Sequence, residues 1–208
     1  MQQINNFIHP TSTIDPTVIL GKNNYIGPYC YITGNTVIGN NNRFEGYCSI
    51  GTPAESRKYF THYGEVHIGN NNTIREYVTI NAGTWRPTSV GNNNIMLRGS
   101  HLGHDVVMEN NITLSCNVLI GGHTWIMEGV NCGLGSITHQ RVILGAFAMI
   151  GMGAIVTKKT PITPGNVYVG NPAKLLRENN LDRFGLTKTS LLSYIETYTS
   201  ILEKPINN

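Results

Sequence analysis

Residues 14–51 read IDPTVILGKNNYIGPYCYITGNTVIGNNNRFEGYCSIG, and this stretch decides the fold. Large apolar residues return in it every six positions, at Ile14, Leu20, Ile26, Ile32, Ile38, Phe44 and Ile50. A helix repeats about every 3.6 residues and a strand about every two, so a period of six describes a larger unit that returns on itself.

The same period continues through most of the chain. It runs over Ile68, Ile74 and Ile80 and holds phase again from Val90 to Val156. The residue after the apolar one is often Gly, and three copies of Gly-Asn-Asn-Asn begin at Gly39, Gly69 and Gly91. Gly and Asn accept backbone angles that other residues resist, so each hexad is interpreted as one short strand and one corner.

Three such strands closing a triangle make an 18-residue coil, and parallel coils stack about 4.8 Å apart. The [LIV]-G-x4 signature is typical of the hexapeptide-repeat family, and this resemblance implies a left-handed parallel β-helix. We therefore expect an all-β domain over residues 1–172, followed by a short helical segment over 173–208. A helix is predicted from about Thr189 to Lys204, capped by Thr189 or Ser190 and packed on the end of the prism or on a neighbouring subunit. Its expected apolar stripe consists of Leu191, Ile195, Tyr198 and Leu202.

Composition excludes several kinds of protein. Charged residues make up 13% of the 208 residues and the formal charge is +3, so no nucleic-acid partner is expected. The start of the chain lacks the pattern of a signal peptide, and no apolar stretch is long enough to span a bilayer. We expect a protein of the bacterial cytoplasm.

The repeat is interrupted twice, over residues 52–67 and 82–89. The first interruption carries Lys58 among other polar and aromatic residues, and the second carries Trp85 and Arg86. Loops of a solenoid often carry function, so both are expected to cover a polar ligand.

Histidines gather in the third run of hexads. His104 and His123 are 19 residues apart, and His123 and His139 are 16 apart, so each step is close to one coil. We expect these three side chains to lie near one corner on successive coils, with Asp105 beside them. Stacked histidines next to a carboxylate favour a catalytic interpretation over a structural one.

At these residues the sequence resembles the UDP-N-acetylglucosamine acyltransferases that begin lipid A synthesis. The resemblance covers about residues 5 to 187. Its segments are Ile74-Arg75-Glu76-Tyr77-Val78-Thr79-Ile80, Ser100-His101-Leu102-Gly103-His104-Asp105, Gly121-Gly122-His123, Thr138-His139-Gln140, and Ser49-Ile50-Gly51 with Arg57-Lys58-Tyr59 beyond it.

The resemblance implies roles for these residues. His104 would be the general base that deprotonates a sugar hydroxyl, Asp105 would orient it, and the Gly122 N–H would stabilise the oxyanion formed from an acyl thioester. The thioester would be carried by acyl carrier protein or coenzyme A, with no metal and no permanently bound cofactor. Further implied contacts to donor or nucleotide sugar are Lys58, His101, His123, His139, Gln140 and, facing a phosphate, Arg183.

The chain also departs from the pattern of this family. Ser56 occupies a sugar-contact position where an acidic residue is expected, and Asn81-Ala82 replace His-Arg in the segment before Gly83. Met152 replaces a glycine of the long-chain members, which predicts a shorter acyl-chain pocket. The segment after Pro172 is shorter than the multi-helix domain of the family. The sequence therefore leaves open the sugar, the nucleotide, the acyl length and the carrier.

One alternative keeps the fold and changes the chemistry. The ending Gly170-Asn171-Pro172-Ala173-Lys174 resembles coenzyme-A-dependent transferases that N-acylate amino sugars on UDP or dTDP carriers for surface polysaccharide synthesis. The His104–Asp105 pair favours a hydroxyl acceptor, because a neutral amine needs a strong base less.

Two further hypotheses come from other classes. A zinc enzyme of the carbonic anhydrase kind would need three converging histidines, and His62 and His67 lack a third residue at the required spacing. A purely structural solenoid would need a repetitive exposed face, which the sequence does not show. We expect instead a homotrimer with active sites in the grooves between prisms.

Overall fold

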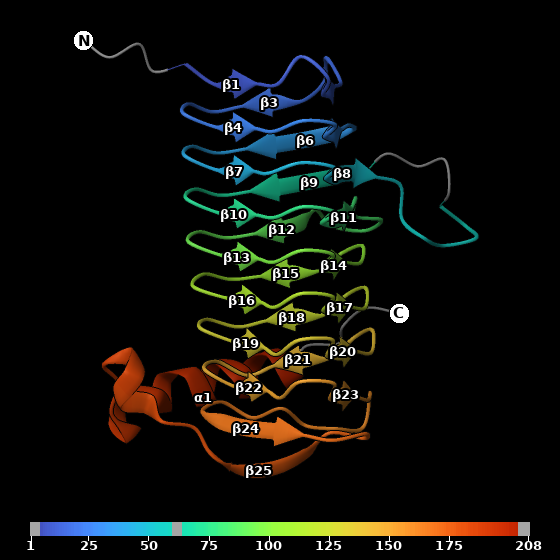
Figure 1. Ribbon diagram of the computed structural model, residues 1–208. Coiled ribbons are helices and arrows are strands. Elements are labelled where there is room, and N and C mark those ends of the chain that lie inside the picture. Colours follow the sequence, from blue (N-terminus) through green and yellow to red (C-terminus); the bar gives the residue numbers. More distant parts are fainter. Residues whose placement is uncertain (1–4, 60–63, 204–208) are drawn as a thin grey trace.

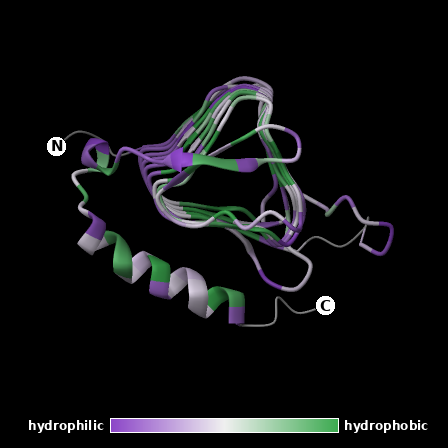
Figure 2. Cartoon of the chain, turned by 90° about the horizontal axis from the view of Figure 1, so that it is seen from below, coloured by the Kyte–Doolittle hydropathy of each residue, from purple (hydrophilic) through white to green (hydrophobic). Residues whose placement is uncertain are grey.

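The computed structural model describes residues 5–59 and 64–203, and the chain winds into a prism of stacked coils (Figure 1). Each coil contributes one short strand to each of three parallel sheets. Seen along its axis, the prism is a triangle with a helix lying along one side (Figure 2). The predicted parallel β-helix is confirmed.

The three sheets are named A, B and C. Sheet A contains β1 (Phe7–Ile8), β4 (Tyr25–Ile26), β7 (Arg43–Phe44), β10 (Thr73–Ile74), β13 (Ile95–Met96), β16 (Thr113–Leu114), β19 (Asn131–Cys132), β22 (Met149–Ile150), β24 (Asn166–Val169) and β25 (Lys174–Glu178). Sheet B contains β2 (Thr13–Ile14), β5 (Tyr31–Ile32), β8 (Ser49–Thr52), β11 (Thr79–Asn81), β14 (His101–Leu102), β17 (Leu119–Ile120), β20 (Ile137–Thr138) and β23 (Ile155–Val156). Sheet C contains β3 (Ile19–Leu20), β6 (Asn35–Ile38), β9 (Glu65–Ile68), β12 (Thr88–Val90), β15 (Val107–Met108), β18 (Trp125–Ile126) and β21 (Ile143–Leu144).

Strand register measures the coil directly. Ile26 pairs with Phe44 and Leu102 with Ile120, each a step of 18 residues. Two steps are longer: Ile50 pairs with Ile80, a separation of 30, and Ile80 pairs with Leu102, a separation of 22. The two interruptions therefore insert 12 and 4 residues beyond the 18-residue coil.

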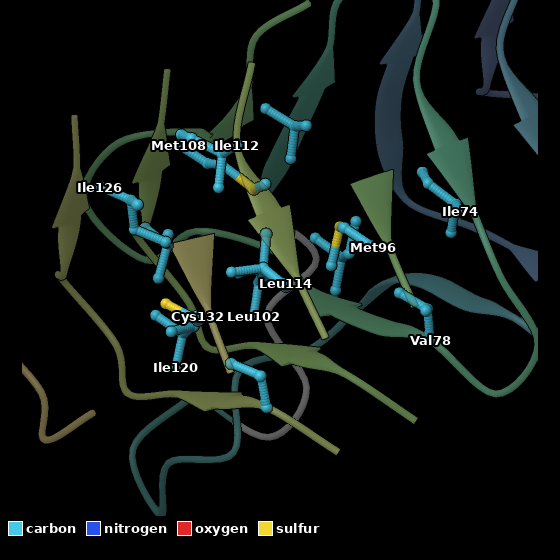
Figure 3. Close-up of a cluster of buried hydrophobic side chains, with 14 of the residues drawn as sticks. Ile74, Val78, Met96, Leu102, Met108, Ile112, Leu114, Ile120, Ile126 and Cys132 are labelled. Carbon is cyan, nitrogen blue, oxygen red and sulfur yellow. The ribbon is translucent and has the colours of Figure 1, made fainter. Parts of the chain in front are cut away.

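The interior of the prism is the apolar column that the six-residue period predicts. From Ile26 to Val156, every residue of that series is at most 3% exposed, including Thr138 (Figure 3). Ile8 is 43% exposed because no coil of the described chain covers the first one. Burying a side chain of this size stabilises the fold by about 1.5–3 kcal/mol, so the stack of coils accounts for the core.

Asparagines support the corners. Asn23, Asn41 and Asn93 adopt a left-handed backbone conformation with φ near +57°, which Asn tolerates well. Buried Asn42 and Asn72 bridge successive coils, since the Asn72 side-chain amide donates to Oδ1 of Asn42 at 2.9 Å. These ladders satisfy polar groups that the narrow prism would otherwise bury unpaired.

The chain ends with an antiparallel strand and a helix. β25 pairs with β24, and a 3-10 helix (Leu181–Phe184) leads into α1 (Lys188–Glu203). The helix packs on the side of the prism at sheet C, against Met127, Ile143 and Phe147. Packing on the end of the prism, one of the two alternatives we expected, is thus wrong. No helix among residues 5–59 and 64–203 is long and apolar enough to cross a membrane.

Two details of the predicted helix are corrected. Its cap is Thr187 rather than Thr189 or Ser190, because the Thr187 side chain accepts from the Ser190 N–H at 3.2 Å. The buried residues are Leu191, Tyr198 and Ile201, whereas Ile195 is 40% and Leu202 is 56% exposed. The predicted end at Lys204 lies outside the described residues.

Candidate active site

The corner that follows β14 brings His104 and Asp105 together. Nδ1 of His104 lies 2.6 Å from Oδ2 of Asp105, and the His104 side chain is 18% exposed. Asp105 adopts a left-handed backbone conformation with φ +61°, which turns its carboxylate into the molecule, where it is fully buried. A buried carboxylate therefore holds one nitrogen of a partly accessible imidazole.

The second interruption surrounds that carboxylate. Backbone N–H groups of Thr84, Trp85 and Arg86 donate to Oδ1 of Asp105 at 2.9, 2.8 and 3.1 Å. The Thr84 hydroxyl donates to Oδ2 at 2.7 Å. This segment thus folds onto Asp105, and the expectation that it covers a ligand is replaced by that role.

These donors set the charge of Asp105. Burial alone would raise the pKa of its carboxyl, but the hydrogen bonds from His104, Trp85, Arg86 and Thr84 outweigh burial and hold the pKa well below its usual value. Asp105 is consequently an anion at neutral pH and can only accept hydrogen bonds. Nδ1 of His104 must then carry a proton, which leaves Nε2 as the free basic nitrogen.

His123 packs against the same pair from the next coil. Its ring meets the His104 ring edge-on with centroids 4.9 Å apart, and its Nε2 lies 3.6 Å from Oδ2 of Asp105. Burial lowers the pKa of His123, while the Asp105 charge opposes this shift. The lowered pKa leaves His123 neutral at pH 7.

Gly122 lies directly beside the free nitrogen of His104. A Cβ placed on Gly122 would lie 2.9 Å from Nε2 of His104, closer than a side chain tolerates. Within residues 5–59 and 64–203, the Gly122 N–H has no hydrogen-bond acceptor. A free backbone donor next to a base is the arrangement that acyl transfer requires.

These groups open into a cleft of about 270 Å³. Its wall is formed by Glu55, Asn81, His101, Gly103, His104, Leu119, Ile120, Gly121, Gly122, Ile137, Thr138 and Gln140. The cleft combines an apolar strip from sheet B with a polar end at the His104 corner. It suits a ligand that has an apolar tail and a polar head.

The remaining residues singled out in the sequence are only partly brought together. His101 lines the cleft and its Nδ1 lies 2.7 Å from the Thr79 hydroxyl. Burial lowers the pKa of His101, opposed by the charge of Glu55. Gln140 also lines the cleft, but His139 is exposed and its Nδ1 lies 2.9 Å from the Gln140 carbonyl oxygen.

Three other predicted residues lie outside the cleft wall of this chain. Lys58 is exposed, with its Nζ 5.3 Å from the centre of the Tyr59 ring. Arg183 is exposed on the 3-10 helix. Met152 is 74% exposed at the corner between sheets A and B, across sheet B from His104.

Several residues of the site were missed in the sequence. Leu119 and Ile137 lie one and two coils beyond His101, so the 18-residue step could have found them. Glu55, next to Ser56, brings a carboxylate to the cleft that the sequence pattern placed one position later. Nothing in the sequence pointed to Thr84 as a partner of Asp105.

Metal binding was tested against the same residues. In the described chain, His104, Asp105 and His123 are the group whose ligand atoms all lie within 4.8 Å of one another. The Asp105 oxygens already accept hydrogen bonds from His104 and residues 84–86, so this set is poorly disposed for a cation. His67 is paired with Glu65 at 3.0 Å, and His62 lies outside the described residues.

Comparisons with known proteins give one consistent result. The chain is 36% identical over 166 residues to the acyl-[acyl-carrier-protein]--UDP-N-acetylglucosamine O-acyltransferase of Nautilia profundicola, covering 76% of this chain and 63% of that protein. It is 37% identical over 143 residues to the enzyme of the same name from Sinorhizobium fredii, covering 66% and 52%. The chain thus spans about half to under two thirds of the length of these curated relatives.

Solved structures agree with the sequence relatives. The UDP-N-acetylglucosamine O-acyltransferase of Moraxella catarrhalis superimposes with a TM-score of 0.77 at 30% identity, over 92% of this chain and 82% of that one. The UDP-N-acetylglucosamine acyltransferase of Francisella novicida gives 0.77 and 30%, over 92% and 78%. Profiles of known protein families give no match to the sequence.

Proposed function

Because the chain belongs to the family of UDP-N-acetylglucosamine acyltransferases, we propose that it moves an acyl group from a thioester to a nucleotide-activated sugar. The acceptor we favour is UDP-N-acetylglucosamine, acylated on oxygen at the start of lipid A synthesis in the bacterial cytoplasm. The observation that carries this proposal is the His104–Asp105 pair, whose free nitrogen faces the unpaired Gly122 N–H across one cleft.

Each group has a defined part in the reaction. Nε2 of His104 takes the proton of the sugar hydroxyl as its oxygen attacks the thioester carbonyl carbon. The Gly122 N–H stabilises the oxyanion of the tetrahedral intermediate. The carbon–sulfur bond then breaks, and His104 returns the proton to the departing thiolate. Asp105 keeps the imidazole oriented throughout, and no metal or bound cofactor takes part.

The donor is a thioester on acyl carrier protein or coenzyme A, and both carry phosphate. The His104 corner continues on later coils as a cationic column, since Val156 pairs with Thr138 and thereby places Lys158 beyond Gln140 and Lys159 beyond Arg141. Lys158 and Lys159 are exposed. Their charges suit the phosphate of the donor arm.

A short acyl group follows from the position of Met152. The exposed Leu119 and Ile137 lead from the cleft across sheet B toward the corner that carries Met152. A methionine at the far edge of this apolar strip leaves less room for a chain than glycine would. We propose that Met152 limits the acyl length.

A homotrimer completes the site in this proposal. The cleft is an open groove in one chain, and the apolar side chains of Leu119, Leu134 and Ile137 on or beside sheet B are 39–49% exposed. Neighbouring prisms would cover this strip and bring Lys58 and Arg183 of one chain toward the cleft of another. A monomer at micromolar concentration in analytical ultracentrifugation would contradict this arrangement.

N-acylation of a nucleotide-linked amino sugar is the second candidate. Glu55 favours it, because a carboxylate on the cleft wall suits an acceptor with N–H donors better than an acetylated amide. Mass spectrometry separates the two. Thioesters of both carriers, in several acyl lengths, are crossed with UDP- and dTDP-linked amino and hydroxy sugars. Acylated UDP-N-acetylglucosamine supports the first candidate and an acylated amino sugar the second; no acylated sugar nucleotide at all contradicts both.

A further inference from the structure

The segment 84–88 grips Asp105 on every polar group that the residue has. Besides the three N–H donors on Oδ1 and the Thr84 hydroxyl on Oδ2, the Thr88 hydroxyl accepts from the Asp105 N–H at 2.8 Å. Nε of Arg86 donates to the Asp105 carbonyl oxygen at 3.1 Å. A surface decoration would not converge on one buried residue in this way.

Extra residues in one coil make this grip possible. The step from Thr79 to His101 is 22 residues instead of 18, and the four additional residues lie directly before the coil that carries His104. Gly83 starts the turn, and a Cβ on it would lie 1.7 Å from the Arg86 carbonyl oxygen. The turn is therefore closed so tightly that its N–H groups point at one oxygen.

The two oxygens of Asp105 have different tasks. Oδ1 takes the three backbone donors, which a side-chain substitution cannot remove. Oδ2 is shared by Nδ1 of His104 at 2.6 Å and the Thr84 hydroxyl at 2.7 Å. Thr84 is thus the side chain that competes with His104 for one oxygen and fixes where that oxygen lies.

We propose that Thr84 is a positioning residue, whose hydroxyl holds Oδ2 of Asp105 so that Nδ1 of His104 keeps its proton and Nε2 faces the cleft. Its kinetic consequence rests on the proposed acyl transfer, whereas its effect on the imidazole does not. The charged or titratable groups around His104 are Asp105, His101 and His123, with Arg86 and Arg141 acting on His123. Of these, the Thr84 hydroxyl contacts Asp105 alone.

Removing the hydroxyl has a predictable sign. In Thr84→Val, Oδ2 loses one donor and concentrates its charge on the Nδ1–H of His104, which favours the imidazolium. The pKa of His104 therefore rises relative to the unmodified protein, and the acidic limb of the kcat/KM profile moves to higher pH. Because the oxygen is also less fixed, kcat falls by roughly tenfold, a part of what a general base contributes. Thr84→Ser keeps the donor and restores both quantities to within about twofold.

The test is NMR of histidine labelled with nitrogen-15, titrated without any substrate. We expect His104 of the unmodified protein to carry its proton on Nδ1, and we expect Thr84→Val to titrate at higher pH or to mix tautomers. Thr36→Val is the matched control, because Thr36 is also fully buried and donates at 2.6 Å to a carbonyl oxygen, but in a coil remote from His104. Its His104 signals should match those of the unmodified protein.

Two results overturn the inference. One is a proton on Nε2 of His104 in the unmodified protein, which needs no variant to fold. The other is a folded Thr84→Val protein whose His104 titrates like the unmodified one. If the NMR behaves as expected but no thioester and sugar react, the proposed function fails while the positioning role stands.

Discussion

Gly122→Ala is the most incisive change to the site, because it adds one methyl group where the base meets the oxyanion donor. The new Cβ would lie 2.9 Å from Nε2 and 3.0 Å from the carbonyl oxygen of His104. Carbon atoms prefer separations of about 3.5–4.0 Å, so the imidazole has to move by roughly half an ångström or more. It cannot retreat, since Nδ1 on its other side lies 2.6 Å from Oδ2 of Asp105.

The expected loss follows from this geometry. A misplacement of about 1 Å costs about 10²-fold in rate, and loss of an oxyanion donor costs about 10²–10³-fold. We expect kcat to fall at least about 10²-fold, which corresponds to about 2.7 kcal/mol of transition-state stabilisation. The crowding itself should destabilise the fold by about 1–3 kcal/mol.

The assay measures acyl transfer by product mass, with thermal unfolding of each variant alongside. Gly46→Ala is the matched control, because its Cβ would lie 3.0 Å from the Pro28 carbonyl oxygen and 3.4 Å from the Pro28 ring, away from the cleft. It should retain its kcat. If Gly122 and His104 act as a unit, adding Gly122→Ala to His104→Ala lowers the rate little further. A folded Gly122→Ala protein with kcat within about threefold of the unmodified protein would refute the reasoning.

Three further predictions address the base, the acid stability and the acyl pocket. His104→Ala should lower acyl transfer by about 10²–10⁴-fold while its circular dichroism spectrum stays unchanged, and near-normal turnover would remove the general-base role. The lowered pKa values of His101 and His123 mean that protonation favours unfolding, so stability should begin to fall as pH drops below about 6.5. The lowered pKa of Asp105 adds a contribution that is complete above about pH 4 and lost below it; acid denaturation that spares stability from pH 6.5 to 3 would contradict both. Met152→Gly should shift preference toward longer acyl thioesters in a competition assay, and an unchanged preference would show that the acyl tail does not reach residue 152.

The fold could be predicted because one rule governs every coil. The residues of the six-residue series from Ile26 to Val156 all point into the prism, and the two interruptions appear as register steps of 30 and 22. The tail obeys no such rule. Leu191, Tyr198 and Ile201 and the series Leu191, Ile195, Tyr198 and Leu202 are both compatible with a helical stripe, and only packing against sheet C selects the first.

The site was accessible to the same ruler only where the step of 18 applies strictly. His104 and Gly122 are 18 apart and meet, as the positions along one corner must. His139 is one position short of the cleft-lining Gln140, and in a corner of few residues one position changes the direction of a side chain. Glu55 and Thr84 lie in inserted residues, where no register exists and only the folded loop decides which group reaches the site.

The claim that acyl transfer occurs at the His104 corner is tested most directly by one paired measurement. The unmodified protein and His104→Ala are each incubated with an acyl thioester and a nucleotide sugar, and the product mass is recorded over time. The account predicts that the unmodified protein adds one acyl group to the sugar nucleotide and that His104→Ala does not. Equal product from both proteins would contradict it, as would the absence of any acylated sugar nucleotide across the donors and acceptors named above.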